Sequence, residues 1–500
     1  MADKSIIIVG AGIAGLAAGC YGQMNGYRTE VFEMHDKPGG LCTAWQRKGY
    51  TIDGCLHWLT DSAPGRGFYR FWEELGMLQG KQVINMEQFH RIEGTDGRVF
   101  NMYCDVDRLE EHMRELAPED ARFIGECARA IRRFRRLDMP VDKAPELHNP
   151  FDGLKSAFRI LPFLGDFRKW AGMTMQDFAM RFKNPLLREA WQATWSVEFP
   201  SLFILTILAL MDQKAGGYVI GGSMELSRAI ERRYLGLGGQ LRYKSRVGKV
   251  LVENDRAVGI KLTDGSEHRA DYVVSAADGH ATIFEMLEGK YVNDMIRGYY
   301  ERLPIFQPLI HIGLGVNRSF SDMPQMVSGL LLALEKPVTI AGTERKWLNV
   351  CIYNFDPTLA PAGKTLLTVM FESRFAYWES LHKDVALYKA EKEQIAATVI
   401  GLLDRRFPGL AAQVEMHDVA TPVTFHRYTG NWQGSFEGWL PTTQTIRLRM
   451  SKTLPGLDRF YMAGQWVQPG GGLPSAAMTG CHVIQMICKR DGKPFAATVP

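Results

Sequence analysis

The sequence predicts an α/β protein made of two interleaved domains, and three observations carry this prediction. A glycine-rich strand–turn–helix opens the chain, a helix followed by a β-meander lies near its middle, and a second glycine-rich strand–turn–helix lies near its end. Such elements are typical of a Rossmann-like nucleotide-binding domain. The long segments between them predict a second domain, a mixed sheet that carries a helical cap.

The first strand–turn–helix is the segment "SIIIVGAGIAGLAAG", in which the β-forming residues 5–9 precede Gly10, Gly12 and Gly15. This G-x-G-x-x-G spacing between a strand and a helix is the context that a dinucleotide-binding turn requires. Gly10 permits the tight turn, Gly12 lets the backbone approach a pyrophosphate, and Gly15 lets the helix pack closely on the strand. N–H groups at the helix N-terminus face the phosphates. The predicted contacts are Gly10, Gly12, Ile13, Ala14 and Gly15.

A second strand, "RTEVFE", ends in an acid at Glu33, eighteen residues after Gly15. A carboxylate at this spacing accepts hydrogen bonds from the ribose hydroxyls of an adenosine. It also repels a 2′-phosphate, which disfavours NADP. NAD and FAD both fit the segment up to this point.

The residues that follow favour FAD. They contain Pro38-Gly39-Gly40, then Gly49, then Asp53-Gly54. This run resembles the extended dinucleotide signature of two-domain FAD flavoproteins, in which the segment after the acid folds back along the cofactor. The resemblance implies further FAD contacts from Met34, Gly40, Leu41 and Gly54. Asp53 and Gly54 are adjacent, whereas the family pattern is D-x-G, and this shifts which residue lies under the flavin.

The middle of the chain, residues 216–277, reads as a loop, a helix and three strands, with Asp264-Gly265 as a hairpin turn. A helix followed by a β-meander completes the nucleotide domain of FAD proteins of this type. By that resemblance, the backbone of Val247 contacts adenine and Ala276 lies beside the phosphate loop.

Near the C-terminus, the strand 460–463 ends in Gly464, and a glycine run leads into a helix that opens at Leu473-Pro474. Proline suits the first turn of a helix. The positive N-terminal end of this helix can stabilise the charge that develops on the pyrimidine edge of a reduced flavin. Many flavoproteins have an acid after the strand's glycine, where this chain has Gln465; an amide still hydrogen-bonds a ribityl hydroxyl. The predicted contacts here are Gly464, Gln465, Gly472, Leu473 and Pro474.

Four segments make the resemblance more specific. The N-terminal signature, "GGYVIGGSMELSRAIE", "TGNWQGSFEGW" and "AGQWVQPGGGLPSAAMTG" resemble the phytoene desaturase and carotenoid isomerase branch of FAD-dependent oxidoreductases. "GCLHWL" is also similar to the corresponding segment of retinol saturases. The resemblance implies an FAD enzyme that desaturates, saturates or isomerises C=C bonds of a long hydrophobic substrate, a polyene, isoprenoid, carotenoid-like or acyl chain.

The expected domain boundaries follow from these segments. Strand-like stretches and the hairpin at Asp96-Gly97 fall in the intervening blocks, whereas residues 105–214 have a mostly helical pattern. We expect the FAD-binding domain to comprise residues 1–74, 215–290 and 450–500, and the substrate domain with its cap to comprise 75–214 and 291–449.

Flavin chemistry needs mainly alignment of the substrate, so a catalytic acid or base is not required. His57 and Trp58 follow the Asp53-Gly54 turn and are expected near the isoalloxazine, as a proton relay and a ring wall; a structural role for His57 is the alternative. Tyr428 and Trp439 are candidates for the substrate-tunnel wall. No second G-x-G-x-x-G follows a strand, so we expect the electrons to pass to a quinone, to oxygen or to a partner, or to need no acceptor and stay on the flavin.

The cap segment interleaves basic and aromatic residues in "ARAIRRFRRLDM" and "FDGLKSAFRILPFLGDFRKWAGM". This pattern suits peripheral contact with anionic lipid headgroups. A solvated helix face above an ordinary core is the alternative. No recognition module accompanies the pattern, and a net charge of +4 is small, so we expect no nucleic-acid partner.

Composition sets the remaining expectations. The eight cysteines include no CxxC pair, which indicates no metal site and reduced thiols in a cytoplasmic protein, with or without membrane association. No signal peptide is recognised, and the most apolar run, residues 201–211, is too short to span a bilayer, so it predicts a buried helix. Two other functions stay open: an amine oxidase or protoporphyrinogen-oxidase-like flavoenzyme, and a carrier of prenylated partners, which need not keep the glycines and the acid.

Overall fold

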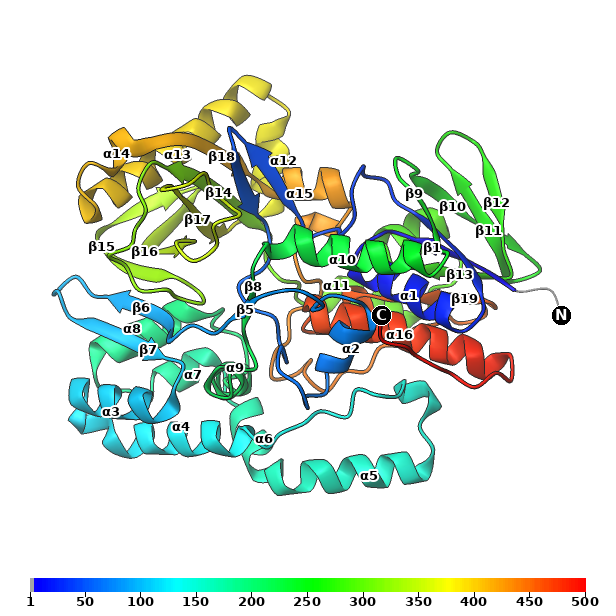
Figure 1. Ribbon diagram of the computed structural model, residues 1–500, viewed down its shortest axis with the longest axis horizontal. Helices are drawn as coiled ribbons and strands as arrows, with labels where there is room; N and C mark the ends of the chain where they lie inside the picture. The colour runs from blue at the N-terminus through cyan, green and yellow to red at the C-terminus, as the bar shows by residue number, and fades with distance from the viewer. Residues whose placement is uncertain (1–3) are drawn as a thin grey trace.

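Residues 4–500 are described by a computed structural model. Figure 1 shows a nucleotide-binding layer on one side of the molecule, a second sheet with its own helices on the other, and a group of helices below. The N-terminal and C-terminal segments both belong to the nucleotide-binding layer, so elements far apart in the sequence lie side by side in it.

The nucleotide-binding layer is built on a five-stranded parallel sheet in the order β19-β13-β1-β2-β9. Ile6 and Ile8 pack on the helical side of this sheet, and Ile7 and Val9 pack on the opposite side, as alternation along a buried strand requires. The strands are β1 (Ser5–Val9), β2 (Arg28–Phe32), β9 (Gln240–Arg242), β13 (Tyr272–Ser275) and β19 (Phe460–Met462).

Three helices cover one face of this sheet, α1 (Ile13–Met24), α10 (Gly222–Gly236) and α16 (Gly472–Arg490). Helices α1 and α16 approach closely because Gly480 has no side chain; a Cβ there would lie 2.5 Å from the Ala14 carbonyl oxygen. The opposite face carries the antiparallel meander of β10 (Val247–Glu253), β11 (Arg256–Leu262) and β12 (Glu267–Arg269). The expected hairpin turn at Gly265 joins β11 to β12.

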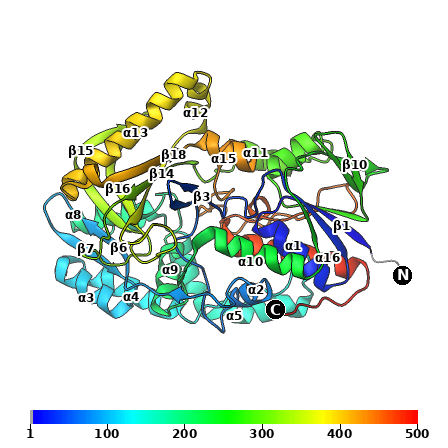
Figure 2. The ribbon, with the colours of Figure 1, turned by 45° about the horizontal axis from the view of Figure 1, so that its top comes forward.

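A seven-stranded mixed sheet in the order β18-β14-β17-β16-β15-β6-β7 forms the second layer. Ile310, Ile312 and Leu314 of β14 share a core with Ile395 and Val399 of the long helix α13, which lies over one face of the sheet (Figure 2). The strands are β6 (Gln88–Glu93), β7 (Val99–Tyr103), β14 (Leu309–Val316), β15 (Leu330–Ile340), β16 (Thr343–Ile352), β17 (Thr365–Glu372) and β18 (Val414–Ala420); the helices beside them are α12 (Phe375–His382), α13 (Val385–Arg406) and α14 (Leu410–Gln413).

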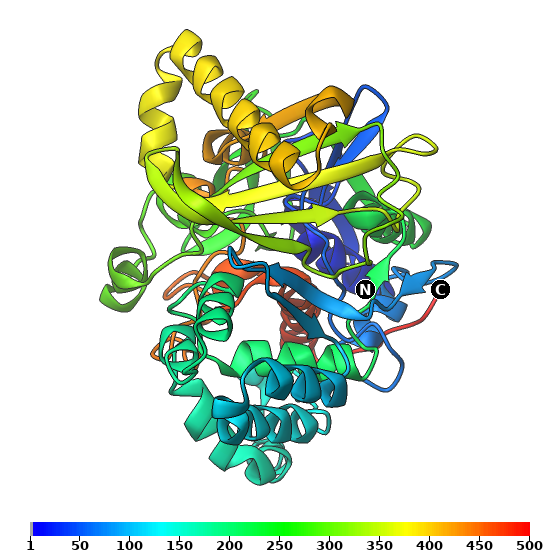
Figure 3. The ribbon, with the colours of Figure 1, turned by 90° about the vertical axis from the view of Figure 1, so that its left-hand side faces the viewer.

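Below this sheet lies the helical cap, residues 106–212 (Figure 3). Its last helix, α9, contains the most apolar run of the chain and is buried as expected, and no helix in residues 4–500 has the length and apolar character needed to cross a membrane. The cap helices are α3 (Val106–Leu116), α4 (Ala121–Phe134), α5 (Pro150–Ile160), α6 (Leu164–Ala171), α7 (Met175–Ala179), α8 (Pro185–Thr194) and α9 (Leu202–Asp212).

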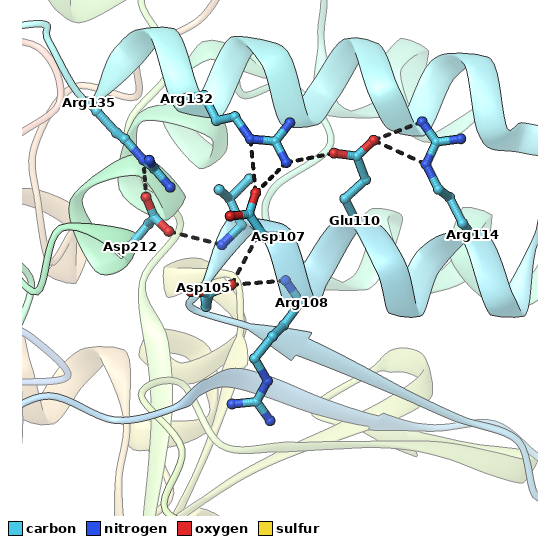
Figure 4. Close-up of polar contacts among 9 residues, drawn as sticks. Asp105, Asp107, Arg108, Glu110, Arg114, Arg132, Arg135 and Asp212 are labelled. Atoms are coloured by element: carbon cyan, nitrogen blue, oxygen red, sulfur yellow. Dashed lines mark hydrogen bonds and ion pairs between the residues drawn. The ribbon is translucent and has the colours of Figure 1, made fainter.

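Ion pairs join three of the cap helices (Figure 4). Arg132 of α4 pairs with Asp107 and, at 2.8 Å, with Glu110, both on α3. Arg135 pairs with Asp212 at the end of α9. Arg132 and Arg135 are therefore both paired within the cap.

A short hairpin connects the two layers, β3 (Ala44–Arg47) with β4 (Tyr50–Asp53). Trp45 donates a hydrogen bond from Nε1 to Asp418 of β18 at 2.8 Å. The remaining elements are α2 (Tyr69–Glu74), β5 (Val83–Ile84), β8 (Tyr218–Val219), α11 (Asp294–Arg302), α15 (Pro422–Thr429), the 3₁₀ turns η1 (Pro118–Asp120), η2 (Pro145–Leu147), η3 (Leu161–Phe163), η5 (Trp432–Gly434) and η6 (Gln465–Val467), and the π-helical turn η4 (Ala281–Met286).

Candidate functional site

A cavity of about 2760 Å³ lies where the two layers and the cap meet. Its lining comes from the glycine turn after β1, the β3–β4 hairpin, the cap, the segment after α15 and the start of α16. Residues from nearly the whole length of the chain therefore meet at one site.

The parallel sheet fixes the order of groups along one side of this cavity. Parallel strands present their carboxyl ends at one edge, so the residues after them meet there. In sheet order, Gly464 follows β19, Ala276 follows β13, Gly10 follows β1 and Glu33 follows β2. Neighbouring strands are about 4.8 Å apart, so these groups span roughly 14 Å. An extended dinucleotide is a ligand of the right shape for such a row.

The glycine turn has the geometry that its spacing predicts. Gly10 adopts a φ of +96°, which only glycine accepts easily. A Cβ added to Gly15 would lie 1.9 Å from the Gly10 carbonyl oxygen, so Gly15 permits the close packing of α1 on the turn. A Cβ added to Gly12 would meet nothing within 4 Å, because this face of the turn opens on the cavity. Helix α1 has no side-chain cap, which leaves its first N–H groups for a ligand.

Glu33 is fixed at the adjoining position. Its two carboxylate oxygens accept hydrogen bonds from the backbone N–H of Ala11 at 2.7 Å and of His35 at 2.8 Å. Burial raises the pKa of Glu33, and these donors act against the increase. Each oxygen keeps a second lone pair for the hydroxyls of a ribose.

Helix α16 supplies a second uncapped N-terminus at the cavity. Gly471 precedes its first residue, Gly472, and no side chain caps either one. Gln465 lines the cavity, and its side chain donates to Asn431 Oδ1 at 3.2 Å. Two helix N-termini, an acid and a glycine turn in one cavity fit the phosphates, ribose and flavin ring of FAD.

The structure brings most of the predicted residues together. Gly15 lies behind the turn and does not line the cavity, in keeping with its packing role. The predicted FAD contacts that do line the cavity are Gly10, Gly12, Ile13, Ala14, Glu33, Met34, Gly40, Leu41, Gly54, Val247, Ala276, Gly464, Gln465, Gly472, Leu473 and Pro474.

His57 and Trp58 also line the cavity. His57 Nδ1 lies 3.6 Å from the Cys351 Sγ, and burial lowers the pKa of His57 to about 4. The imidazole is therefore neutral at pH 7 and can accept a proton but cannot supply one as imidazolium. Trp58 packs beside Phe89 and Trp195, at ring-centroid distances of 5.8 and 6.4 Å.

The two residues predicted for the tunnel wall lie elsewhere. Trp439 is buried and does not line the cavity, because it packs among Tyr300, Trp432 and Trp466. Tyr428 lines the cavity, but its ring lies 5.0 Å from that of His35, two residues after Glu33. Tyr428 is therefore at the end expected to hold adenosine, where the sequence placed it at the substrate end.

A row of aromatic side chains, which we call the aromatic wall, lines the cavity beyond Trp58. Successive ring centroids along it are 6.4, 5.3, 5.6 and 5.1 Å apart. No pattern in the sequence predicts this wall, since its members come from the cap, the segment after β4, the segment before β14 and the segment after η5, and they meet only in the fold. The aromatic wall consists of Trp58, Trp195, Phe199, Phe306 and Phe436.

Two carboxyl groups that the sequence analysis missed also line the cavity. Burial raises the pKa of Asp278 and of Glu437 to about 7. Asp278 accepts hydrogen bonds from the N–H of Ala281 and of Trp432, both at 2.8 Å. Glu437 lies against Gly471 and Gly472 at the start of α16. Among residues 4–500, no group of three or more His, Cys, Asp or Glu side chains is arranged to hold a metal ion.

Comparison with known proteins identifies the family of the chain. The family described as flavin containing amine oxidoreductase matches residues 13–487. The neurosporene-forming phytoene desaturase of Rhodobacter capsulatus is 26% identical, over 96% of this chain and 93% of that protein. The chloroplastic prolycopene isomerase of Arabidopsis thaliana is 24% identical, over 95% of this chain and 81% of that protein.

Solved structures show the same fold at lower identity. A redesigned putrescine oxidase superposes with a TM-score of 0.61 at 14% identity, covering 98% of this chain and 99% of that one. An oxidoreductase from Methanosarcina mazei superposes with a TM-score of 0.58 at 18% identity, covering 96% of this chain and all of that one. The predicted fold class and the resemblance to phytoene desaturases and carotenoid isomerases are confirmed. The chain belongs to the flavin-containing amine oxidoreductase family and is an FAD-dependent oxidoreductase.

Proposed function

We propose that this enzyme desaturates, saturates or isomerises carbon–carbon double bonds of a long apolar substrate, a polyene, isoprenoid or acyl chain. The aromatic wall is the observation that supports this most, because it offers an elongated apolar surface beside the glycine-rich cofactor groups. Pockets for small ligands usually measure about 300–1,000 Å³. A cavity of about 2760 Å³ has room for a dinucleotide and a second, elongated molecule.

The chain's own part in this chemistry is alignment and exclusion of water. Bound FAD supplies hydride transfer. Rings such as Trp58 can stabilise positive charge on a reacting carbon through their faces. His57, neutral at pH 7, can accept a proton in the same part of the cavity. We propose His57 and Trp58 as the residues nearest the reacting carbons.

We propose that FAD lies along the row from Glu33 to Gly464, with adenosine at Glu33 and the flavin ring towards α16. The sixteen predicted contacts that line the cavity would hold it. The same proposal divides the chain into an FAD-binding domain (1–74, 215–290 and 450–500) and a substrate domain (75–214 and 291–449). Limited proteolysis with and without FAD tests these boundaries. Desaturation would need a quinone or oxygen as electron acceptor, saturation would need a reductant, and isomerisation would need neither.

Entry from a membrane surface is the finer part of the proposal. Helix α5 lies on the outer edge of the cap (Figure 1), and Phe151, Leu154 and Phe158 on it are 80%, 56% and 65% exposed. Lys155 and Arg159 of the same helix are exposed as well. An exposed apolar face flanked by cations is the pattern of an interfacial helix.

The same helix also reaches the cavity, since Gly153, Ala157 and Ile160 line it. A substrate leaving a bilayer at α5 would therefore enter the cavity without crossing water. We propose a cytoplasmic protein that docks peripherally on a membrane through this helix.

Anaerobic product analysis tests the proposed function. Holoenzyme is incubated with vesicles that contain a polyene, and the products are separated and weighed by mass spectrometry. Desaturation lowers the mass by two hydrogens, saturation raises it by two, and isomerisation conserves it. We expect one of these changes together with a change in the flavin spectrum.

A matched pair of variants links the activity to the aromatic wall. Trp195→Ala should lower turnover at least tenfold and leave the flavin spectrum unchanged, whereas Trp347→Ala, on β16 and outside the cavity lining, should keep turnover. Reduction of the flavin by amines, with every apolar chain unchanged, would overturn the proposal and favour the amine-oxidase alternative.

A further inference from the structure

Two cysteines face each other at the open end of the β3–β4 hairpin. The register pairs Ala44 with Asp53, and the Gly54 N–H continues the ladder by donating to the Thr43 carbonyl at 3.0 Å. One step further along this register, the next facing positions are Cys42 and Cys55, just outside the two strands. Residues opposite each other beyond a hydrogen-bonded pair have Cα atoms about 4.5 Å apart and side chains on the same side. A disulfide bridges Cα atoms roughly 4.4–6.8 Å apart.

Both chain segments pack on Ser223. The Cys42 thiol donates to the Ser223 carbonyl at 3.4 Å, and the N–H of Leu56, next to Cys55, donates to the Ser223 Oγ at 2.9 Å. Both cysteines are free thiols and both line the cavity. Cys42 is 3% exposed, whereas Cys55 is exposed on the side of the cavity.

The pair lies at the α16 end of the cavity. Cys42 follows Leu41, and Cys55 lies between Gly54 and His57 in the chain. The carboxyl group of Glu437 is close enough to raise the pKa of Cys55, and Glu437 packs against the first residues of α16. The thiols are therefore on the side of the cavity where the flavin ring is proposed, away from Glu33.

We propose that Cys42 and Cys55 are a redox-active dithiol that exchanges two electrons with the bound flavin. In the oxidising direction the two thiols lose two protons and two electrons, and one Sγ–Sγ bond forms. Oxidised FAD bound in the cavity would be the acceptor and would take up both electrons and both protons. The reverse step breaks the disulfide and restores the two thiols. The reduced pair would store two electrons beside the cofactor.

The surroundings of the pair confine this exchange to the cavity. The neighbouring Cys42 thiol, together with desolvation inside the cavity, raises the pKa of the Cys55 thiol well above its ordinary value. A protonated thiol reacts slowly with oxidants dissolved in water. A flavin held against the pair does not have to diffuse to it. The proposal depends on FAD as the cofactor and not on the identity of the apolar substrate.

Electron counting on the holoenzyme tests the pair without any substrate. Oxidised protein is titrated anaerobically with dithionite, and the flavin spectrum reports the end point. We expect four electrons per FAD for the wild type and two for Cys42→Ser and for Cys55→Ser. Cys104→Ser is the matched control, because Cys104 is buried outside the cavity lining, and it should keep four.

Peptide mapping of the wild type alone gives a second readout, which holds if a variant fails to fold or to bind FAD. Oxidised holoenzyme is alkylated, digested and analysed by mass spectrometry. A peptide linked through Cys42 and Cys55, present in oxidised and absent from reduced protein, is the expected result. Uptake of only two electrons by the wild type, with both cysteines alkylated in the oxidised holoenzyme, would overturn the proposal.

Discussion

Substituting alanine for Gly12 or for Gly15 should separate cofactor binding from folding. The two glycines are three residues apart on the same turn, and alanine adds the same methyl group to each. At Gly12 the methyl group meets no protein atom within 4 Å and projects into the cavity, whereas at Gly15 it lies 1.9 Å from the Gly10 carbonyl oxygen. One variant therefore fills the space proposed for the pyrophosphate, and the other disrupts the contact between turn and helix.

The magnitudes follow from these surroundings. Gly12 has a φ of −67°, so alanine is not strained there, and the cost to the FAD-free protein is the poorer N-cap, about 0.5–1 kcal/mol. Gly15→Ala forces the Gly10 carbonyl to move by more than an ångström in a buried turn, an overpacking cost of about 3 kcal/mol. For FAD, displacement of the pyrophosphate by the Gly12→Ala methyl group should weaken binding at least tenfold, or about 1.4 kcal/mol.

Two measurements decide between these outcomes. Urea unfolding of the FAD-free proteins gives the free energy of unfolding, and quenching of flavin fluorescence gives the affinity for FAD. The reasoning predicts that Gly12→Ala loses affinity and keeps stability, and that Gly15→Ala loses both. Wild-type affinity in Gly12→Ala, or equal destabilisation of the two apoproteins, would refute the placement of the cofactor against this turn.

Three further substitutions test the acid, the membrane helix and a buried carboxyl group. In Glu33→Gln only the amide oxygen can accept a hydrogen bond, so one of the two backbone donors, the N–H of Ala11 or of His35, loses its acceptor. FAD should then bind at least tenfold more weakly (about 1.4 kcal/mol) in a fluorescence titration. Unchanged affinity would remove Glu33 from the site. Phe151→Ser and Phe158→Ser should each weaken cosedimentation with anionic vesicles roughly tenfold, since a fully buried phenylalanine contributes about 1.5–3 kcal/mol, and should leave thermal unfolding unchanged because both rings are exposed. Glu437 has a folded-state pKa raised to about 7, so its contribution to stability is present at low pH and is lost as pH rises through 7. The free energy of unfolding of FAD-free wild type, measured in urea relative to Glu437→Gln, should therefore fall by an amount on the order of 1–3 kcal/mol between pH 5 and pH 8; an identical pH profile for the two proteins would contradict the assignment.

The parts of the site that the sequence predicts are those governed by local backbone chemistry. A turn with the φ of Gly10 needs glycine, a helix that opens without a side-chain cap is visible as a glycine run before Leu473, and an acid directly after a strand is visible at Glu33. Each of these signals lies within a few residues of the group that it positions. The sheet order then brings them to one edge without further information.

The substrate side depends on contacts between distant segments, and there the sequence was a poor guide. Trp439 and Trp195 are equally aromatic, yet Trp439 is buried against Trp466 whereas Trp195 lines the cavity. Which of them faces the cavity depends on how the cap packs on the second sheet, and no periodicity in the sequence encodes that packing. The cysteine pair was hidden for the same reason: Cys42 and Cys55 are thirteen residues apart and meet only because the β3–β4 register aligns them.

The β3–β4 hairpin also connects the second sheet to the cofactor side of the cavity. Its tip end packs on the second sheet, where Gly315 and Gly313 of β14 leave room for Tyr50 and Ile52; a Cβ at either glycine would come within 2.6 or 2.9 Å of these side chains. Its open end carries Gly54 and the cysteine pair into the cavity. The hairpin is thus held by the second sheet at one end and presents cofactor-facing groups at the other. The ten residues of this hairpin, Ala44–Asp53, therefore fix the distance between the second sheet and the cofactor-facing groups.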